Sequence, residues 1–391
     1  MRKQSTKTDE PGRVVLEGVP RVHFYDGGPQ VPEDEMFPAC LKACLQFMGE
    51  DFGSKEITEH RSTWHVDNLY VYIMGTSGAA FRLMWHSQRW DLANTSTNIM
   101  AADALEPVRR AFEAVGYAHE AFGNQDSKLI GHEGVDFFTE YRDYDYLRSR
   151  IIESIRDRRR PVIAFGVIGP PAACVITGYD EHGEVIVGWN FFQVFPEFAT
   201  AVDVEPSGYF RKADWFEDTQ GLIIIGEKQE RPSPGETYRK ALRWALEIVR
   251  TPLIHDYHSG LAAYDAWADA LLRDEDFPVD DADTLRERHM VHNDAVGTLA
   301  EARWYASLFS RQVAEDEPAM AVELLAAAEC YEAEHDLMWD VWDLMGGRDF
   351  SDELVNRLAE PAVRRQIAPL ILQARDRDAE AADYVEEALA R

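Results

Sequence analysis

Short hydrophobic runs of two different periods alternate along the first 228 residues of the chain. Five runs rich in valine and isoleucine have the length and composition of β-strands, and two longer runs place apolar residues at helical spacing. The predicted strands are 14–16, 161–166, 173–177, 185–189 and 222–226, and the predicted helices are 102–115 and 146–157. This alternation predicts an α+β domain.

Beyond a polar, proline-bearing stretch (KQERPSPG, 228–235), the pattern becomes helical almost throughout. Alanine, leucine and tryptophan recur at spacings of three and four in segments 236–250, 260–272, 283–315, 318–345 and 352–390. This spacing predicts a bundle of about five to seven helices. We therefore predict a flexible tail (1–14), an α+β domain (15–228), a linker (229–235) and an all-α domain (236–391).

Composition and charge narrow the class of protein. A hydrophobic content of 46% with 11% aromatic residues is typical of a folded globular chain. The formal net charge of -30 argues against nucleic acid or an anionic membrane as a partner, because both would be repelled. The polar first 13 residues and the absence of a run of about 18 apolar residues favour a cytoplasmic protein. Its four cysteines are expected to be thiols.

The segment FPACLKACLQFMG (37–49) carries the strongest candidate chemistry. Pro38 is acceptable in a first helical turn, apolar residues recur at 41, 44, 45 and 48, and Gly49 offers a stop. A helix over about 38–48 would put Cys40 in its first turn, where helix amides lower the pKa of a thiol. Cys40 is therefore a candidate nucleophile, although a buried core thiol is the commoner role of such a residue.

The Cys-x-x-Ala-Cys-Leu pattern that begins at Cys40 resembles the nucleophile helix of the cysteine peptidase domains attached to bacteriocin exporters. The resemblance implies a papain-like fold in which a histidine near the start of a later strand is the base and an asparagine after the next strand orients it. Gly178 and Tyr179 mark the matching turn, which places the base at Ala172 and the orienting amide at Asn190. Alanine cannot accept a proton, so an ordinary Cys-His-Asn mechanism lacks its base.

The papain-like fold would have its cleft between the Cys40 helix and the strands around residues 172–190. Two further residues are expected near a substrate in that cleft. Cys174 lies two residues after Ala172, so it shares a strand face with Ala172 and could look toward Cys40. Trp189 adjoins Asn190. A thiol pair, a redox contact or a metal at these cysteines is an open alternative, but they lack a C-x-x-C zinc spacing, and neither a metal nor a cofactor is expected.

The segment GTSGAAFRLMWHSQRW (75–90) joins a small-residue turn to an amphipathic run. The amides of Gly75, Ser77 and Gly78 could form a nest for a carboxylate or phosphate, with Arg82 supplying positive charge. The alternative is that the glycines only permit close backbone packing. His86 is the candidate surrogate base, although most such histidines are partly exposed surface residues.

This segment and the cysteine helix together resemble the N-terminal domain of butirosin biosynthesis protein H, over about residues 15–227. Members of that group are linked to acyl transfer from a carrier protein onto an amine. The leading hypothesis is therefore a cysteine-dependent acyltransferase or amide-bond enzyme acting on a small-molecule, peptide or carrier-protein thioester. One alternative is a non-catalytic ligand-binding protein that has lost its catalytic histidine, and a weaker one is a metal or redox protein.

Two sets of residues in the helical part have less specific interpretations. His289 and His292 lie one turn apart, and Glu332 with His335 forms a Glu-x-x-His step, so the four could bind a metal if they face each other. Solvent-exposed polar helix faces are the commoner explanation of such residues. The aromatic residues expected in the core or in a homodimer interface are Trp304, Trp339 and Trp342.

Overall fold

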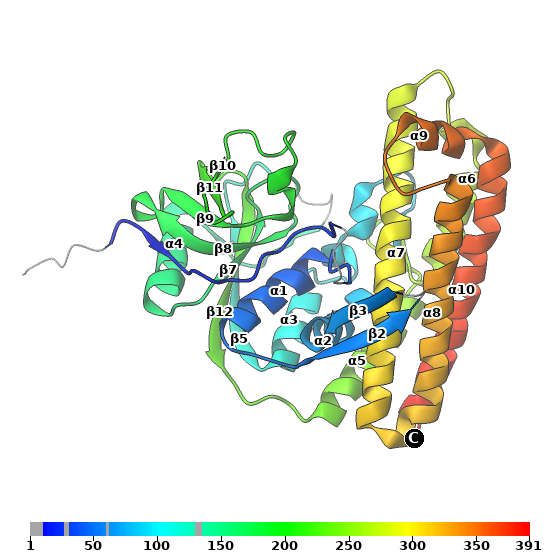
Figure 1. The fold of residues 1–391 in the computed structure, drawn as a ribbon, viewed down its shortest axis with the longest axis horizontal. Helices are drawn as coiled ribbons and strands as arrows, with labels where there is room; N and C mark the ends of the chain where they lie inside the picture. The colour runs from blue at the N-terminus through cyan, green and yellow to red at the C-terminus, as the bar shows by residue number, and fades with distance from the viewer. Residues whose placement is uncertain (1–10, 27–30, 60–61, 130–134) are drawn as a thin grey trace, which may run out of the picture.

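The computed structural model describes residues 11–26, 31–59, 62–129 and 135–391. A large sheet lies at one side, long helices lie at the other, and helices α1 (Met36–Phe47), α2 (Asn68–Ser77) and α3 (Glu106–Val115) lie between them (Figure 1). The predicted α+β class is therefore confirmed. The predicted tail (1–14) falls mostly outside the described residues.

The large sheet has the strand order β10-β11-β9-β8-β7-β12-β5-β6, and β1 also pairs with β8. All its described pairings are antiparallel except β5 with β6. Helix α1 packs on β7 and β8, and α4 (Tyr144–Ile152) packs on β5, β8 and β12. Its strands are β1 (Val14–Val15), β5 (Tyr117–Asn124), β6 (Tyr141–Arg142), β7 (Val162–Gly166), β8 (Ala173–Asp180), β9 (Val185–Trp189), β10 (Asp203–Val204), β11 (Phe210–Ala213) and β12 (Thr219–Lys228).

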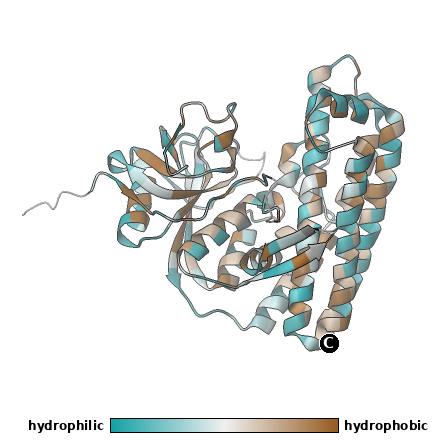
Figure 2. Ribbon diagram, in the orientation of Figure 1, coloured by the Kyte–Doolittle hydropathy of each residue, from teal (hydrophilic) through white to brown (hydrophobic). Residues whose placement is uncertain are grey.

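The predicted helical region begins at the predicted linker. Its long helices show alternating hydrophobic and hydrophilic stripes (Figure 2), as expected for amphipathic helices that share a core. Segment 352–390 forms two helices rather than one, because Glu360 precedes a proline and adopts an extended conformation. The helices are α5 (Pro234–Arg250), α6 (Leu261–Leu272), α7 (Ala282–Asp316), α8 (Ala321–Met345), α9 (Asp352–Ala359) and α10 (Pro361–Leu389).

Packing crosses the predicted boundary between the two regions. Strand β4 (Met84–His86) pairs with β14 (Tyr257–Ser259), which also pairs with β13 (Leu253–Ile254), so residues from both regions share one small sheet. The region predicted to be all-α therefore contains two short strands. Trp85 of β4 stacks on Trp267 of α6 with ring centroids 5.6 Å apart. The two regions are therefore joined by a common interior.

A buried ionic network also joins them. The guanidinium of Arg303 in α7 donates to the carboxylates of Glu334 at 3.0 Å and Asp378 at 2.6 Å, and to the hydroxyl of Tyr264 at 3.0 Å. It also donates to the carbonyl oxygens of residues 80 and 82, which flank the end of the short helix η1 (Ala79–Phe81). Arg303 of α7 thus connects four helices of the bundle, its own and those of its three side-chain partners, to the N-terminal region.

Two elements near the cysteine helix were not predicted. A hairpin of β2 (Ser54–Glu59) and β3 (Ser62–Asp67) leads into α2, whose residues 69–77 are all buried. A helix that is apolar all round has no amphipathic pattern to detect. Within the described residues, no helix is long and apolar enough to span a bilayer.

Candidate functional site

Cys40 lies in the second turn of α1, because the helix begins two residues earlier than predicted. The amide of Ala39 already donates to the Glu35 carbonyl at 3.0 Å, so the unpaired amides of the first turn precede Cys40. Cys40 and Cys44 have no exposed surface. Burial, with the neighbouring thiol of Cys174, raises the pKa of Cys40 well above its usual range. The predicted lowering of this pKa is therefore wrong.

Cys174 is the residue that lies beside both Cys40 and Asn190. Its thiol donates to the Gly166 carbonyl at 3.7 Å and also hydrogen-bonds the Asn190 side chain. Asn190 donates to the same carbonyl at 3.1 Å. The turn spacing in the sequence had put Ala172 at this place. Ala172 lies just outside β8, where its carbonyl accepts from the Gly166 amide at 2.9 Å.

The thiols of Cys40, Cys44 and Cys174, which we call the thiol cluster, are protonated at neutral pH. Burial raises the pKa of Cys174 to about 12, although hydrogen bonding to Asn190 opposes the shift. Burial also raises the pKa of Cys44. A thiolate is the nucleophilic form of cysteine, so this cluster holds no activated nucleophile in the conformation described.

Asn190 has a local structural role as well. It caps the short helix η6 (Phe191–Val194), accepting from the Phe192 amide at 2.8 Å, while Gln193 accepts from the Asn190 amide at 2.9 Å. Trp189 pairs with Val175, the neighbour of Cys174, so it lies on the opposite sheet face from Cys174. The structure therefore brings Asn190, but not Trp189, to Cys174.

The glycines of segment 75–90 permit close packing between helices. A β-carbon on Gly75 would lie 2.2 Å from the Phe309 ring, and one on Gly78 would lie 2.3 Å from the Trp244 indole nitrogen. Gly78 ends α2 with a φ of 87°, and the Ser77 carbonyl accepts from that indole at 3.2 Å. These contacts support the interpretation in which the glycines permit close backbone packing.

Arg82 and His86 both make contacts with groups other than the thiols. Arg82 has 1% of its surface exposed and donates to the Glu35 carboxylate at 2.5 Å and to the carbonyl of Thr95. His86 Nδ1 accepts from the backbone amides of Gln88 at 3.0 Å and Arg89 at 3.3 Å. The Nδ1 lone pair of His86 is therefore directed at its own turn.

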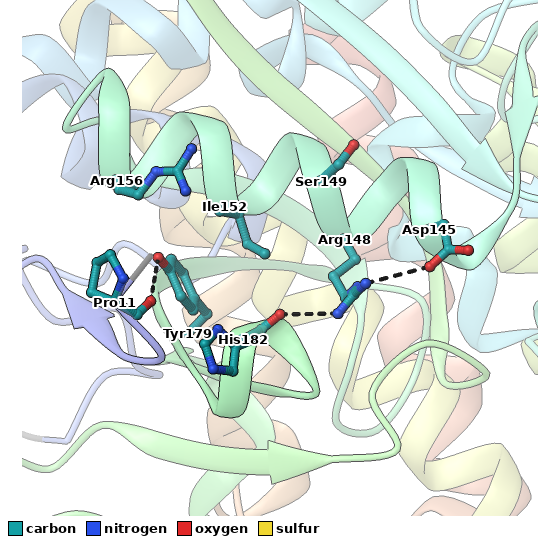
Figure 3. Close-up of a pocket in the computed structure, with 8 residues that line it drawn as sticks. All are labelled: Pro11, Asp145, Arg148, Ser149, Ile152, Arg156, Tyr179 and His182. Carbon is teal, nitrogen blue, oxygen red and sulfur yellow. Dashed lines mark hydrogen bonds and ion pairs between the residues drawn. The ribbon is translucent and has the colours of Figure 1, made fainter. Parts of the chain in front are cut away.

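A cavity of about 400 Å³ lies elsewhere, between α4 and the turn that joins β8 to β9 (Figure 3). Helix α4 continues there as a π-helical turn, η4 (Glu153–Asp157), and Glu181 and His182 have φ values of 50° and 56°. Such π-helical turns and left-handed non-glycine residues recur at functional sites. The lining residues are Pro11, Asp145, Arg148, Ser149, Ile152, Arg156, Tyr179 and His182.

The cavity combines apolar walls with polar groups, as Figure 3 shows. Ile152 and the ring of Tyr179 supply apolar surface, and the Tyr179 hydroxyl donates to the Pro11 carbonyl at 3.3 Å. Arg148 donates to the His182 carbonyl at 3.1 Å and to Glu184 at 3.2 Å, and Arg156 pairs with Asp157. Sequence reasoning missed this cavity because its lining comes from three separate segments that carry no motif.

The residues considered for a metal site are distributed among other contacts. His292 is buried and its Nδ1 accepts from the Trp267 indole at 3.1 Å, while His335 donates to the Ala300 carbonyl at 2.9 Å. Glu332 pairs with Arg311 at 2.5 Å. Across the described parts of the chain, no three histidine, cysteine or acidic side chains are grouped as a metal site would require.

The tryptophans expected in the core or in a homodimer interface differ in exposure. Trp304 is buried, whereas Trp339 is 40% exposed.

Comparison with known proteins assigns the chain to no family: no family model matches it, and no curated protein matches it either.

Proposed function

We propose that the protein is a non-catalytic binding protein whose papain-like cysteine site has lost its base. The observation that carries the proposal is the thiol of Cys174 beside Cys40 and Asn190. A catalytic cysteine needs a proton acceptor within hydrogen-bond reach, and a thiol with a pKa of about 12 does not accept a proton at neutral pH. Cys40 itself is out of reach of a substrate because it has no exposed surface.

The ligand would occupy the cavity between α4 and the β8–β9 turn. Its volume falls within the range of about 300–1,000 Å³ that is usual for small-molecule sites. Apolar walls beside arginine and histidine side chains suit a small organic molecule that carries an acidic group. That group would compete with Asp145 and Glu184 for Arg148, and with Asp157 for Arg156. Under this proposal the thiol cluster is part of the core.

The second candidate is the cysteine-dependent acyl-transfer or amide-bond enzyme. It is favoured by the placement of Asn190, whose side chain reaches Cys174 on the sheet face nearest Cys40. For catalysis, α1 would have to move so that Cys40 meets solvent and a proton acceptor. The two candidates therefore differ in the reactivity of one thiol.

Alkylation of the native protein by iodoacetamide, read for each cysteine by mass spectrometry, separates the candidates. We expect Cys40 to react no faster than Cys44 and Cys174 below about pH 7, and all three to react once the protein is unfolded. Fast reaction of Cys40 alone in that pH range would contradict the binding proposal and support the enzyme.

The cavity is tested separately by thermal shift with citrate, malate and glucose 6-phosphate as probes. Ser149→Trp places a large side chain at the cavity wall and should abolish any shift. Ser207→Trp, in an exposed turn, is the matched control and should keep it. A shift that survives in Ser149→Trp would place the ligand elsewhere.

A further inference from the structure

Two tryptophans near the end of α8 form an aromatic surface. Trp339 is 40% exposed, Trp342 is partly buried, and their rings meet edge to face with centroids 5.1 Å apart. The Trp339 indole donates to His335 Nε2 at 2.9 Å, and the Trp342 indole donates to Asn293 Oδ1 at 2.9 Å. Since both indole N–H groups are bonded within the chain, the two rings are held in place and offer a partner their faces.

A cation of the same chain already lies on these rings. Arg348 is exposed and belongs to the turn between α8 and α9, near the top of the bundle in Figure 1. Its guanidinium lies 4.9 Å from the Trp339 ring centroid and 5.4 Å from that of Trp342. The chain has 70 acidic residues, yet none in the described ranges forms an ion pair with Arg348. The rings therefore hold this guanidinium by cation–π contact.

The face of α8 beside the rings is acidic. Asp336, Asp340 and Asp343 are exposed and follow each other at helical spacing, and Trp339 lies three residues after the first and four before the last. Residues so spaced share one helix face. Across the part of the chain that the structure describes, no lysine or arginine pairs with Asp340 or Asp343. We call the faces of Trp339 and Trp342, with these three aspartates, the aromatic–acidic surface.

We propose that the aromatic–acidic surface docks an arginine-rich segment of a partner protein. One guanidinium of the partner would take the place of Arg348 on the tryptophan faces, and neighbouring basic side chains would pair with the aspartates. Replacement is open because the Arg348 side chain is held only by the rings in the described structure. Tryptophan is also among the residues that contribute most to binding at protein interfaces.

Charge and geometry select this partner over the alternatives. A second copy of the chain would carry the same net charge of -30 and would be repelled. Arginine fits better than lysine because its planar guanidinium stacks on aromatic faces, as that of Arg348 does. The surface shares no residue with the cavity beside α4, so the proposal does not depend on the proposed binding function.

Isothermal titration calorimetry of the full chain with a hexaarginine peptide, at about 0.15 M salt, tests the surface. Trp339→Leu should weaken binding about fivefold through loss of the cation–π contact. Asp340→Asn combined with Asp343→Asn should also weaken it about fivefold. The matched control is Glu275→Gln combined with Asp280→Asn, which removes the same charge from exposed positions between α6 and α7 and should leave the affinity within about twofold.

Arg348→Ala gives the sharpest result, because it frees the tryptophan faces and should tighten binding about fivefold. Arg243→Ala removes one exposed positive charge from α5 and should change the affinity less than about twofold. Absence of binding, or equal effects of Arg348→Ala and Arg243→Ala, would overturn the proposal. A dimer of the native protein that Trp339→Leu abolishes in sedimentation would also overturn it. The thermal-shift probes of the cavity should act equally on Trp339→Leu, so the two proposals can fail independently.

Discussion

The Arg303 network and the thiol cluster are both fully buried groups of polar side chains, yet they are held in different ways. Arg303 donates to two carboxylates, a hydroxyl and two carbonyls, so its charge is surrounded by strong hydrogen bonds. Burial, with the Asp378 charge, raises the pKa of Glu334, whereas its ion pair with Arg303 opposes that shift. The thiols of Cys40 and Cys174 are neutral, weak donors.

The difference shows why burial of a polar group does not by itself identify a site. A buried charge is costly unless it is paired, so each member of the Arg303 network depends on the others. A buried thiol behaves as a small hydrophobic group and needs no partner of opposite charge. In the described structure the cysteines of the motif lie buried in the core, whereas residues that no motif marked connect the two regions.

Removal of Arg303 should have the largest effect. Arg303→Met leaves Asp378 as an unpaired buried carboxylate, and loss of one partner of a buried pair costs about 3–5 kcal/mol. Urea unfolding followed by circular dichroism measures this loss. Arg311→Met, two turns later on α7 and partly exposed, should change stability by less than about 1 kcal/mol. Similar losses in the two variants would mean that the network contributes no more than a surface pair.

The close approach of α2 to α7 should give an intermediate effect. Gly75→Ala would place a β-carbon 2.2 Å from Phe309, and forced overpacking of a core costs about 1–3 kcal/mol. Gly297→Ala is the matched control within a helix, because its β-carbon would lie 3.7 Å from Trp342. It should stabilise the protein by about 0.5–1 kcal/mol, since alanine favours a helix. Tolerance of Gly75→Ala would leave the anion-nest interpretation open again.

The sequence predicted the elements whose periodicity is plain. The helix around Cys40, the strands β7 to β9 and the amphipathic helices of the second region all lie close to their predicted ranges. The entirely buried α2 was missed because nothing in its pattern distinguishes one face from another. The division at Pro361 was missed although the proline itself predicts a break.

The site was less predictable than the fold because it depends on contacts between distant segments. Spacing from a turn selected Ala172, whereas strand pairing brings Cys174 next to Asn190. The first turn of a helix favours a thiolate, but a sequence predicts the start of a helix only to within about two residues. Helix α1 begins two residues before its predicted start, so Cys40 lies in the buried second turn. Nothing local to Cys40 indicates how completely it is buried.

Replacement of single thiols should have the smallest effect and should sharpen the comparison most. Cys40→Ala removes one sulfur atom from the core, which costs about 1 kcal/mol by analogy with a buried methylene, and Cys44→Ala should cost the same. Equal losses in urea unfolding fit thiols that only fill space. Residues kept for activity are often held at a cost in stability, so their removal stabilises a protein. If Cys40→Ala were more stable than the native protein while Cys44→Ala were less stable, that result would support Cys40 as a nucleophile.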